Sequence, residues 1–298
     1  MTDFVLDIST GPTVVKTRDG LLRLQKHDEP VQDLPLAEVA VVVVAHPAVM
    51  LSHGALSGLA ENGAAVIVCS RSYLPVGMIL PLDHHHIQAE RFAQQAAASK
   101  PVCKQAWRAV VQAKIRAQAA VLRTVHGESF GLDALAGRVR SGDPTNVEAQ
   151  AAQRYWRVLF DDPAFRRRRD GTDQNRYLNF GYAVMRGAVA RAICAAGLHP
   201  GIGIHHRNRY NAFCLADDLI EPYRPLVDRA VVEIVREYGA TADWSNDAKK
   251  GLLALLVRRY QCGSEQRTLF DILFKTTSSL AAVFDGRQQR LEVAEVRV

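Results

Sequence analysis

The stretch VGMILPLDHHHIQAERFAQQAAA, residues 76–98, marks the point where the character of the chain changes. Before Pro81 the chain carries short runs of β-branched and apolar residues, which favour strands. After Pro81, Ala, Gln, Arg and Leu dominate and apolar residues recur three and four apart, which favours helices. We therefore predict an α+β fold in two domains. The first is a small N-terminal β-sheet or sandwich domain over residues 1–80, and the second is a larger all-α domain over residues 81–298.

Toward the N-terminus the pattern predicts six strands and one helix. The strands are expected at residues 4–8, 13–17, 21–24, 39–44, 65–69 and 76–80. Asp19-Gly20 is a hairpin signal between the second and third of them. The helix should begin near Ser52 and end at Asn62-Gly63, where the glycine suits a left-handed cap.

Toward the C-terminus the pattern predicts only helices. They are expected at about residues 86–98, 102–124, 131–139, 146–160, 175–196, 212–238, 245–260 and 266–284. The tail, residues 287–298, alternates apolar and polar side chains and fits either a strand or a disordered end.

Charge and cysteine usage narrow the class of protein. The 298 residues include 37 Lys and Arg against 31 Asp and Glu, a net charge of +6, which favours a polyanionic partner without requiring one. The five cysteines are scattered and form no Cys-x-x-Cys pair, so neither a disulfide framework nor a zinc site is expected. The start lacks the pattern of a signal peptide, and the longest apolar stretch, 39–45, is too short to span a membrane. We expect a soluble, cytoplasmic protein.

Residues 203–225 are the part of the chain densest in groups that can bind a metal. His206 is followed by Asp217, Asp218 and Glu221, and this mixture of nitrogen and oxygen ligands suits Mg²⁺ or Mn²⁺ better than structural zinc. On one helix Asp218 and Glu221 would share a face. The residues alone do not choose between His206 and its neighbour His205, nor do they dismiss Asp217. The acids also fit a second interpretation, in which they stabilise the start of a helix and Arg224 pairs with Glu221.

Glu148 is a further candidate, because it shares a helical face with Ala152, Tyr155 and Leu159. A carboxylate on a face that buries needs a cation, a metal or a hydrogen-bond network to offset the cost of losing water. Its position near a helix start also fits a favourable interaction with the helix dipole.

Basic and histidine-rich segments supply weaker signals. Arg166-Arg167-Arg168-Arg169 suits phosphate contacts, although a solvated charge run fits as well. Arg186 lies off the apolar stripe of its helix and could face nucleic acid or solvent. We interpret His84-His85-His86 as a linker, because neighbouring side chains point in different directions. The chain has no phosphate-binding glycine loop, nucleophile elbow or dinucleotide fingerprint.

Several motifs in order along almost the whole chain resemble one family. They are Lys114-Ile115 with Gln118, Glu148 followed by Tyr155-Trp156, YLNFGYA at 177–183, GIHH at 203–206 and LADDLIEPYRPLVD at 215–228. In these motifs the chain resembles the CRISPR-associated spacer-acquisition integrases, particularly the form found in type II systems. It departs from them at Ala149 and in the tail after Leu280, which puts the subtype in doubt more than the activity.

The resemblance implies a site and a reaction. An N-terminal β-domain would mediate dimerisation, and Glu148, His206 and Glu221 of the α-domain would bind Mg²⁺ or Mn²⁺, with Asp218 as a second-rank ligand. The family spacing selects His206 over His205. Basic residues would hold double-stranded DNA, the candidates being Arg166, Arg167, Arg168, Arg186 and Arg207. The implied reaction is transesterification, in which a 3′-hydroxyl of a short duplex attacks the edge of a CRISPR repeat.

The partners implied by the resemblance are a second copy of the chain, a small ferredoxin-like adaptation protein and, in type II systems, the RNA-guided effector nuclease. Two other functions fit the same residues. A stand-alone metal-dependent DNA nuclease would need the same ligands but no partner. A non-catalytic nucleic-acid binding protein would use the acids at 148, 218 and 221 only to cap helices.

Overall fold

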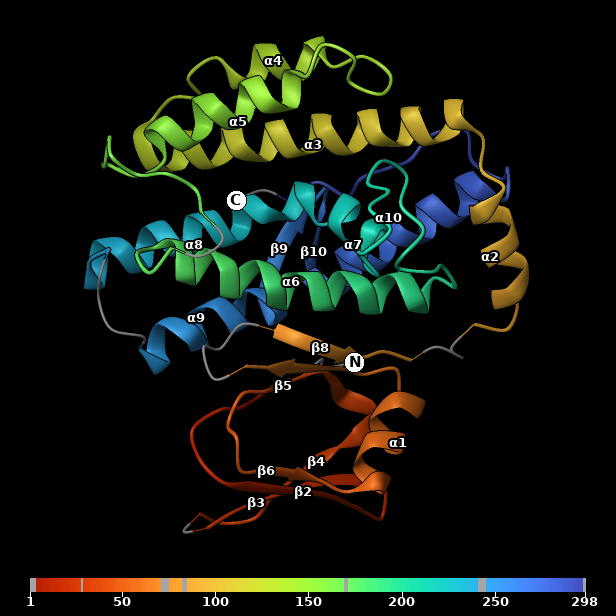
Figure 1. Ribbon diagram of the computed structural model, residues 1–298, viewed down its shortest axis with the longest axis vertical. Coiled ribbons are helices and arrows are strands. Elements are labelled where there is room, and N and C mark those ends of the chain that lie inside the picture. The colour runs from red at the N-terminus through yellow and green to blue at the C-terminus, as the bar shows by residue number, and fades with distance from the viewer. Residues whose placement is uncertain are drawn as a thin grey trace.

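The structure is a computed structural model that describes residues 4–27, 29–70, 75–81, 85–168, 171–240 and 245–296. Its elements form stacked layers (Figure 1). Two β-sheets lie at one end of the molecule, a group of helices lies against one of these sheets, and the long helix α3 crosses the far side of that group under α4 and α5. This arrangement confirms the predicted α+β class, with β-sheets before a mostly helical region.

The N-terminal part contains two four-stranded sheets. One has the order β1 (Phe4–Ile8), β5 (Val39–Val44), β7 (Ala65–Cys69) and β8 (Pro75–Ile79). Its first three strands are parallel and β8 is antiparallel to β7. The other has the order β4 (Gln32–Pro35), β3 (Leu21–Lys26), β2 (Thr13–Arg18) and β6 (Val49–Leu51). Strands β4 and β6 were not predicted, because they are short and lack an alternating apolar pattern.

The one predicted helix of this part is confirmed as α1 (His53–Glu61). The Ser52 hydroxyl accepts a hydrogen bond of 3.1 Å from the Ala55 N–H, which satisfies a free donor of the first turn. Gly63 follows the helix with a φ of 74°, the left-handed conformation that glycine adopts at little cost.

Strand β5 joins the two halves of the molecule. All six of its residues, Val39–Val44, are buried. Val42 packs with Ile8, Leu22 and Leu59 between the two sheets. Val41 and Val43 face the other way and belong to the core of the helical region. A strand buried on both faces reads as a continuous apolar run, which is why its sequence does not alternate.

The helical region contains most of the predicted helices. They are α2 (Gln88–Ala96), α3 (Lys100–His126), α4 (Leu132–Arg138), α5 (Val147–Val158), α6 (Asn175–Ala195), α9 (Asn246–Val257) and α10 (Leu269–Phe284). The prediction that this region is purely helical needs one correction. Residues 259–262 and 265–268 form a two-stranded hairpin, β9 (Arg259–Cys262) and β10 (Glu265–Thr268). Gly263, with a φ of 63°, allows the tight turn between them.

The predicted helix at 212–238 is wrong as a single element. The chain forms α7 (Cys214–Leu219), a 3₁₀ turn η2 (Glu221–Tyr223) and α8 (Arg224–Tyr238). Pro222 and Pro225 lack the N–H that a continuous helix needs, and each is tolerated only in a first turn. Because the helix breaks, Asp218 and Glu221 do not share one helical face.

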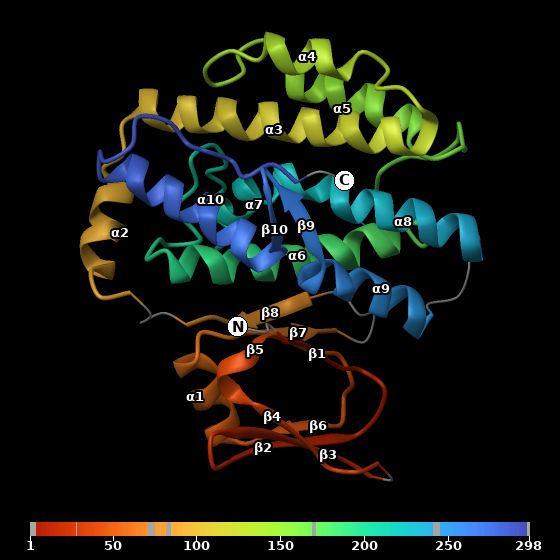
Figure 2. The ribbon, with the colours of Figure 1, turned by 180° about the vertical axis from the view of Figure 1, so that it is seen from behind.

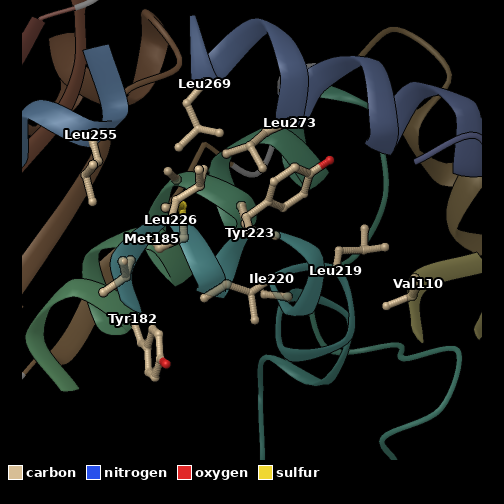
Figure 3. Packing of buried hydrophobic residues seen from close by; sticks show 14 of the residues in the cluster. Val110, Tyr182, Met185, Leu219, Ile220, Tyr223, Leu226, Leu255, Leu269 and Leu273 are labelled. Atoms are coloured by element: carbon tan, nitrogen blue, oxygen red, sulfur yellow. The ribbon is translucent and has the colours of Figure 1, made fainter. Parts of the chain in front are cut away.

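The broken segment is held by its apolar side chains. Leu219, Ile220 and Tyr223 flank Glu221 in sequence, and each is at most 1% exposed. Figure 3 shows them packed among buried residues of the surrounding helices, including Leu269 and Leu273 of α10. The position of the Glu221 backbone is therefore fixed by the core.

The tail described at 287–296 has neither helix nor strand, yet it is anchored. It runs along α3 toward the C-terminus (Figure 2), and Glu295 pairs with Arg116 of α3 at 2.9 Å. The Tyr223 hydroxyl donates to the Ala294 carbonyl at 3.3 Å. In the part of the chain that the structure describes, none of the helices has the length and apolar character needed to cross a membrane.

Candidate functional site

Two glutamates from distant parts of the chain meet at one lysine. Lys114, in the middle of α3, places its Nζ 2.6 Å from Glu148 Oε1 and 2.5 Å from Glu221 Oε2. Glu148 is held in the first turn of α5, because the Asp143 carboxylate accepts hydrogen bonds of 2.9 Å from the N–H groups of Val147 and Glu148. The break at Pro222 directs Glu221 toward α3. Two of the three predicted ligands thus converge on a single cation.

Glu221 is ionised although it is buried. Its side chain is 10% exposed, and Arg224 Nε lies 2.9 Å from its Oε1. Burial works against the carboxylate, but Arg224 and Lys114 outweigh burial and lower the pKa of Glu221. The pair with Arg224 is the one that the sequence pattern also allowed. The cation that faces Oε2 is Lys114, whose Nζ lies 2.5 Å away.

His206 is oriented by Asp218. The Asp218 side chain is fully buried, and its Oδ1 lies 2.6 Å from His206 Nδ1. Because a carboxylate only accepts, Nδ1 carries the proton and donates it to Asp218. The opposite ring nitrogen, Nε2, is then the one with a lone pair. The hydrogen bond to Asp218 also raises the pKa of His206, against the effect of burial.

Asp218 has its other contacts with the backbone. Its Oδ2 accepts from the N–H groups of Ile204 at 2.8 Å and His205 at 3.0 Å, and its Oδ1 accepts from the His206 N–H at 3.1 Å. A carboxylate with this many donors has little capacity left for another partner. The arrangement favours Asp218 as a residue that positions His206, while its predicted second-rank metal role stays a proposal.

The neighbouring imidazole of His205 has a different environment. Its ring stacks on Trp107 of α3 at 4.1 Å with an interplanar angle of 4°. His206 meets the same indole edge-on at 5.8 Å. His206, but not His205, lines the cleft that also contains Glu221.

The cleft measures about 640 Å³ and has a basic wall. Besides His206 and Glu221 its lining includes Arg167, Arg186, Tyr210 and Arg224. Arg167 and Arg224 each lie over the ring of Tyr182, at 5.2 Å and 4.6 Å from its centroid. The cleft thus combines the carboxylate of Glu221 with several guanidinium groups. The guanidinium groups suit the phosphates of a nucleic-acid backbone, and the carboxylate suits a metal ion beside that backbone.

Behind Tyr182 lies a buried acid. Asp228, 1% exposed, accepts hydrogen bonds from the hydroxyls of Tyr155, at 2.9 Å, and Tyr182. Burial raises the pKa of Asp228 to about 6, although both tyrosine hydrogen bonds work in the opposite direction. This network fixes the ring on which Arg167 and Arg224 stack.

The structure places the predicted basic residues at several sites. Arg167 and Arg186 line the cleft, where Arg167 donates to Asn179 at 2.7 Å and Arg186 pairs with Asp217 at 2.8 Å. Asp217, which the pattern left open, is thereby committed to Arg186. Arg166 and Arg168 line a separate, smaller hollow. Arg207 is exposed on the loop after His206.

The arginine segment 166–169 and the histidine segment 84–86 each extend outside the described residues. Arg169 and His84 are not described. His85 and His86 stack on each other with their ring centroids 4.7 Å apart.

Glu148, Glu221 and His206, which we call the acidic corner, are residue types that suit a divalent cation. Among the described residues no three His, Cys, Asp or Glu side chains lie close enough together to hold a metal as they stand. Lys114 lies between the two carboxylates. The donor set is two glutamates and one imidazole nitrogen, and the buried Glu221 Oε2 has only a cation for a partner. Hard oxygen donors with one nitrogen are the ligands expected for Mg²⁺ or Mn²⁺.

Sequence reasoning named Lys114 only as part of a motif and gave it no role. Its signal was present, because Lys114 lies one turn from Val110 and one turn from Gln118 on a face of α3 that buries. A lysine on such a face needs an anionic partner. Asp228 carried the same signal, because it is a carboxylate among the buried residues of α8, whereas Tyr182 reads as ordinary core.

Solved structures share this two-part fold. A casposase bound to its integration product superposes with a TM-score of 0.79 and 16% identity, covering 98% of this chain and 93% of that one. A Cas1 protein from Thermotoga maritima gives a TM-score of 0.77 and 17% identity, covering 98% of this chain and all of that one, 100%. The architecture is therefore the one that Cas1 proteins and casposases have in common.

Sequence comparison identifies the family. The family described as CRISPR associated protein Cas1 matches residues 6–259. A CRISPR-associated endonuclease Cas1 from Neisseria meningitidis serogroup C (strain 8013) is 35% identical over 288 residues, 93% of each chain. The chain belongs to the Cas1 family of CRISPR-associated endonucleases and integrases, as its motifs predicted.

Proposed function

We propose that this Cas1 chain is a Mg²⁺- or Mn²⁺-dependent integrase that inserts short duplex DNA into a CRISPR array by transesterification. The observation that carries the proposal is the convergence of Glu148 and Glu221 on Lys114, together with the cleft that Glu221 and His206 line with several arginines. The integration product bound by the structurally similar casposase supports the same reaction here.

Glu148, Glu221 and the Nε2 atom of His206 would hold the metal. When bound, the ion would supply charge stabilisation at the target phosphate and lower the pKa of the attacking 3′-hydroxyl. The chain's own residues do the rest. Asp218 keeps the His206 ring in the tautomer that presents Nε2, as carboxylates commonly do for metal-binding histidines.

The arginines of the cleft would hold the target backbone. Arg167 and Arg224 are preoriented by Tyr182, and Arg186 by Asp217. Exchange of one P–O bond for another leaves the number of phosphodiester bonds unchanged, so the reaction needs no external energy source. Arg166, Arg168 and Arg207 would extend the contact with DNA outside the cleft.

The partners follow from the family and are part of the proposal. They are a second copy of the chain, a small ferredoxin-like Cas2-type protein and, for a type II system, the RNA-guided effector nuclease. A Cas1–Cas2 complex that also contains a Cas6 and a reverse transcriptase is among the similar structures, with a TM-score of 0.76 and 18% identity, and it covers 99% of this chain but 36% of that one. We further propose residues 1–80 as a dimerisation domain, residues 81–298 as the catalytic domain, and the prokaryotic cytoplasm as the location.

The test uses a short duplex with free 3′-hydroxyls and a supercoiled plasmid that carries the repeat, in Mn²⁺, with and without the small partner. Wild type should join the duplex covalently to the repeat edges. Glu148→Gln, Glu221→Gln and His206→Ala should each lower joining by roughly 100-fold or more. His205→Ala is the matched control and should retain most activity. A duplex with 3′-dideoxy ends should give no joining.

Two results would overturn the proposal. Plasmid degradation without joining would identify a stand-alone nuclease. Undiminished joining by all three site variants would place the chemistry elsewhere.

A further inference from the structure

Lys114 occupies the position that a metal bound to both glutamates would need. Arg224 already pairs with Glu221 Oε1, at 2.9 Å. The carboxylate oxygen of Glu221 that faces away from this pair is Oε2, and Lys114 Nζ lies 2.5 Å from it. Mg²⁺ binds its oxygen ligands at roughly 2.0–2.1 Å, so the ion would stand closer to Oε2 than the ammonium does now. The two cations cannot share this place.

The charges of the corner are balanced without a metal. Glu148 and Glu221 face Lys114 and Arg224, which is two negative groups against two positive ones. The Lys114 side chain is only 12% exposed, so solvent screens it weakly. The lysine is therefore a charged counter-ion for both carboxylates.

We infer that Lys114 is a tethered cation that holds Glu148 and Glu221 together until a divalent ion binds, and that it leaves the two carboxylates when the ion arrives. The inference rests on the proposed function, because it takes the same carboxylates as metal ligands. Its physical basis is competition. The apparent metal affinity of a site is its intrinsic affinity multiplied by the fraction of time that the competing ammonium is withdrawn.

A lysine is suited to this role and an arginine is not. Its ammonium is a point charge on a flexible four-carbon stem, which can move away without breaking a planar, two-pronged pair. Arg224, stacked over Tyr182 and paired with Glu221, is the fixed counter-ion of the same corner. The corner thus has one permanent and one exchangeable cation.

The experiment measures Mn²⁺ binding to the full-length protein without DNA at pH 8, by calorimetry and by electron paramagnetic resonance of free Mn²⁺. Wild type is compared with Lys114→Met, Lys114→Gln and Glu148→Gln. Lys104→Met is the matched control, because Lys104 is exposed and lies on the same helix about 15 Å away along the axis. Thermal unfolding of each protein is recorded in EDTA and in saturating Mn²⁺.

Lys114→Met and Lys114→Gln should bind Mn²⁺ at least about tenfold more tightly than wild type. Their Tm should fall in EDTA and should rise more in Mn²⁺ than the Tm of wild type does. Lys104→Met should match wild type in both measurements. If the Lys114 variants fold only when Mn²⁺ is present, that result supports exchange as well.

Weaker or unchanged Mn²⁺ binding by the Lys114 variants, with wild type still binding, would show that the ammonium works beside the metal and would overturn the inference. Failure of these variants to fold even in Mn²⁺ would do the same, because the metal could not replace the ammonium. Equal Mn²⁺ binding by wild type and Glu148→Gln would instead refute the metal centre of the proposed function. The two failures are therefore distinguishable.

Discussion

Asp218 shows how much one buried carboxylate can organise. It accepts three backbone hydrogen bonds from residues 204–206 and a fourth contact from the His206 ring. The loop that presents His206 therefore has its shape imposed by a residue that never reaches the cleft. Sequence spacing made Asp218 a possible ligand. Spacing alone could not show that its carboxylate faces the backbone of residues 204–206.

Asp218→Asn should destabilise the fold by about 3 kcal/mol, since an amide NH₂ would face N–H donors in a buried place. Well below its Tm the variant should also lose about tenfold in Mn²⁺ affinity, because the His206 ring is no longer fixed. Urea unfolding and Mn²⁺ titration measure the two effects. Asp161→Asn, at a side chain 78% exposed, is the control and should alter neither. Unchanged metal affinity in Asp218→Asn would contradict the positioning role.

Asp228 makes the stability depend on pH. Burial raises its pKa from 3.8 to about 6, so between these values the folded protein binds a proton more readily than the unfolded chain. The stability that this group contributes is therefore present below pH 4 and is lost as pH rises through 6. Relative to Asp228→Asn, wild type should lose on the order of 2–3 kcal/mol between pH 4 and pH 7.

Denaturant unfolding of both proteins across this pH range checks the prediction. The difference in unfolding free energy should move in favour of Asp228→Asn as pH rises. A difference that stays constant with pH, or moves the other way, would show that the buried acid is already fully compensated.

At the scale of elements, close helix packing depends on glycine. Gly181 of α6 faces α8 so closely that an added Cβ would lie 2.4 Å from Val227 Cγ1. Such a contact cannot exist, so the Val227 side chain or one of the two helices would have to move. Gly251 of α9 is a glycine with no neighbour within 4 Å of an added Cβ. The two positions are a matched pair for one substitution.

Gly181→Ala should destabilise the protein by about 1–3 kcal/mol through overpacking. Gly251→Ala should stabilise it by about 0.5–1 kcal/mol, because alanine is the better helix former and meets no obstacle. Thermal and denaturant unfolding distinguish the signs. Equal effects at both positions would mean that the α6–α8 contact is looser than described.

Sequence patterns predicted the elements better than their junctions. Strand β1 and helices α6 and α10 were located to within a few residues, because each has a sustained apolar pattern. The break at Pro222 was missed although proline is its direct cause, since the apolar spacing continues across it. Strand β4 was missed because pairing with β3, and not its own pattern, makes it a strand.

The same limit applies to the site. The resemblance assigned Glu148, His206 and Glu221, and the residues alone narrowed the acids but left two histidines open. Neither approach placed Lys114 between the glutamates, because a contact between α3, α5 and η2 depends on the whole fold. Whether the predicted ligands lie close together therefore depends on how α3, α5 and η2 pack.

At the scale of the molecule, a buried ion pair joins the sheets to the helices. Lys249 of α9 is fully buried and its Nζ lies 3.0 Å from Asp7 Oδ2 of β1. Removal of one partner of a buried pair leaves the other charge without compensation. The pair therefore ties the N-terminal sheet to the helical region next to the core that β5 also shares.

Lys249→Met should lower the unfolding free energy by about 2 kcal/mol, somewhat less than for a fully buried pair because Asp7 is 18% exposed. Lys250→Met is the control on the next residue. Lys250 is 72% exposed and 3.8 Å from Asp247, so its loss should cost at most about 0.5 kcal/mol. Urea unfolding of both variants makes the comparison. Equal small losses would show that the sheet and helices are held together by apolar contacts alone.

The central claim is that Glu148, His206 and Glu221 form one metal centre. A crystal grown in saturating Mn²⁺ and measured at a wavelength where manganese scatters anomalously tests it directly. One anomalous peak should lie roughly 2.0–2.4 Å from an oxygen of each glutamate and from His206 Nε2, with Lys114 Nζ withdrawn. A saturated crystal without a peak there, with Lys114 still between the two carboxylates, would contradict it.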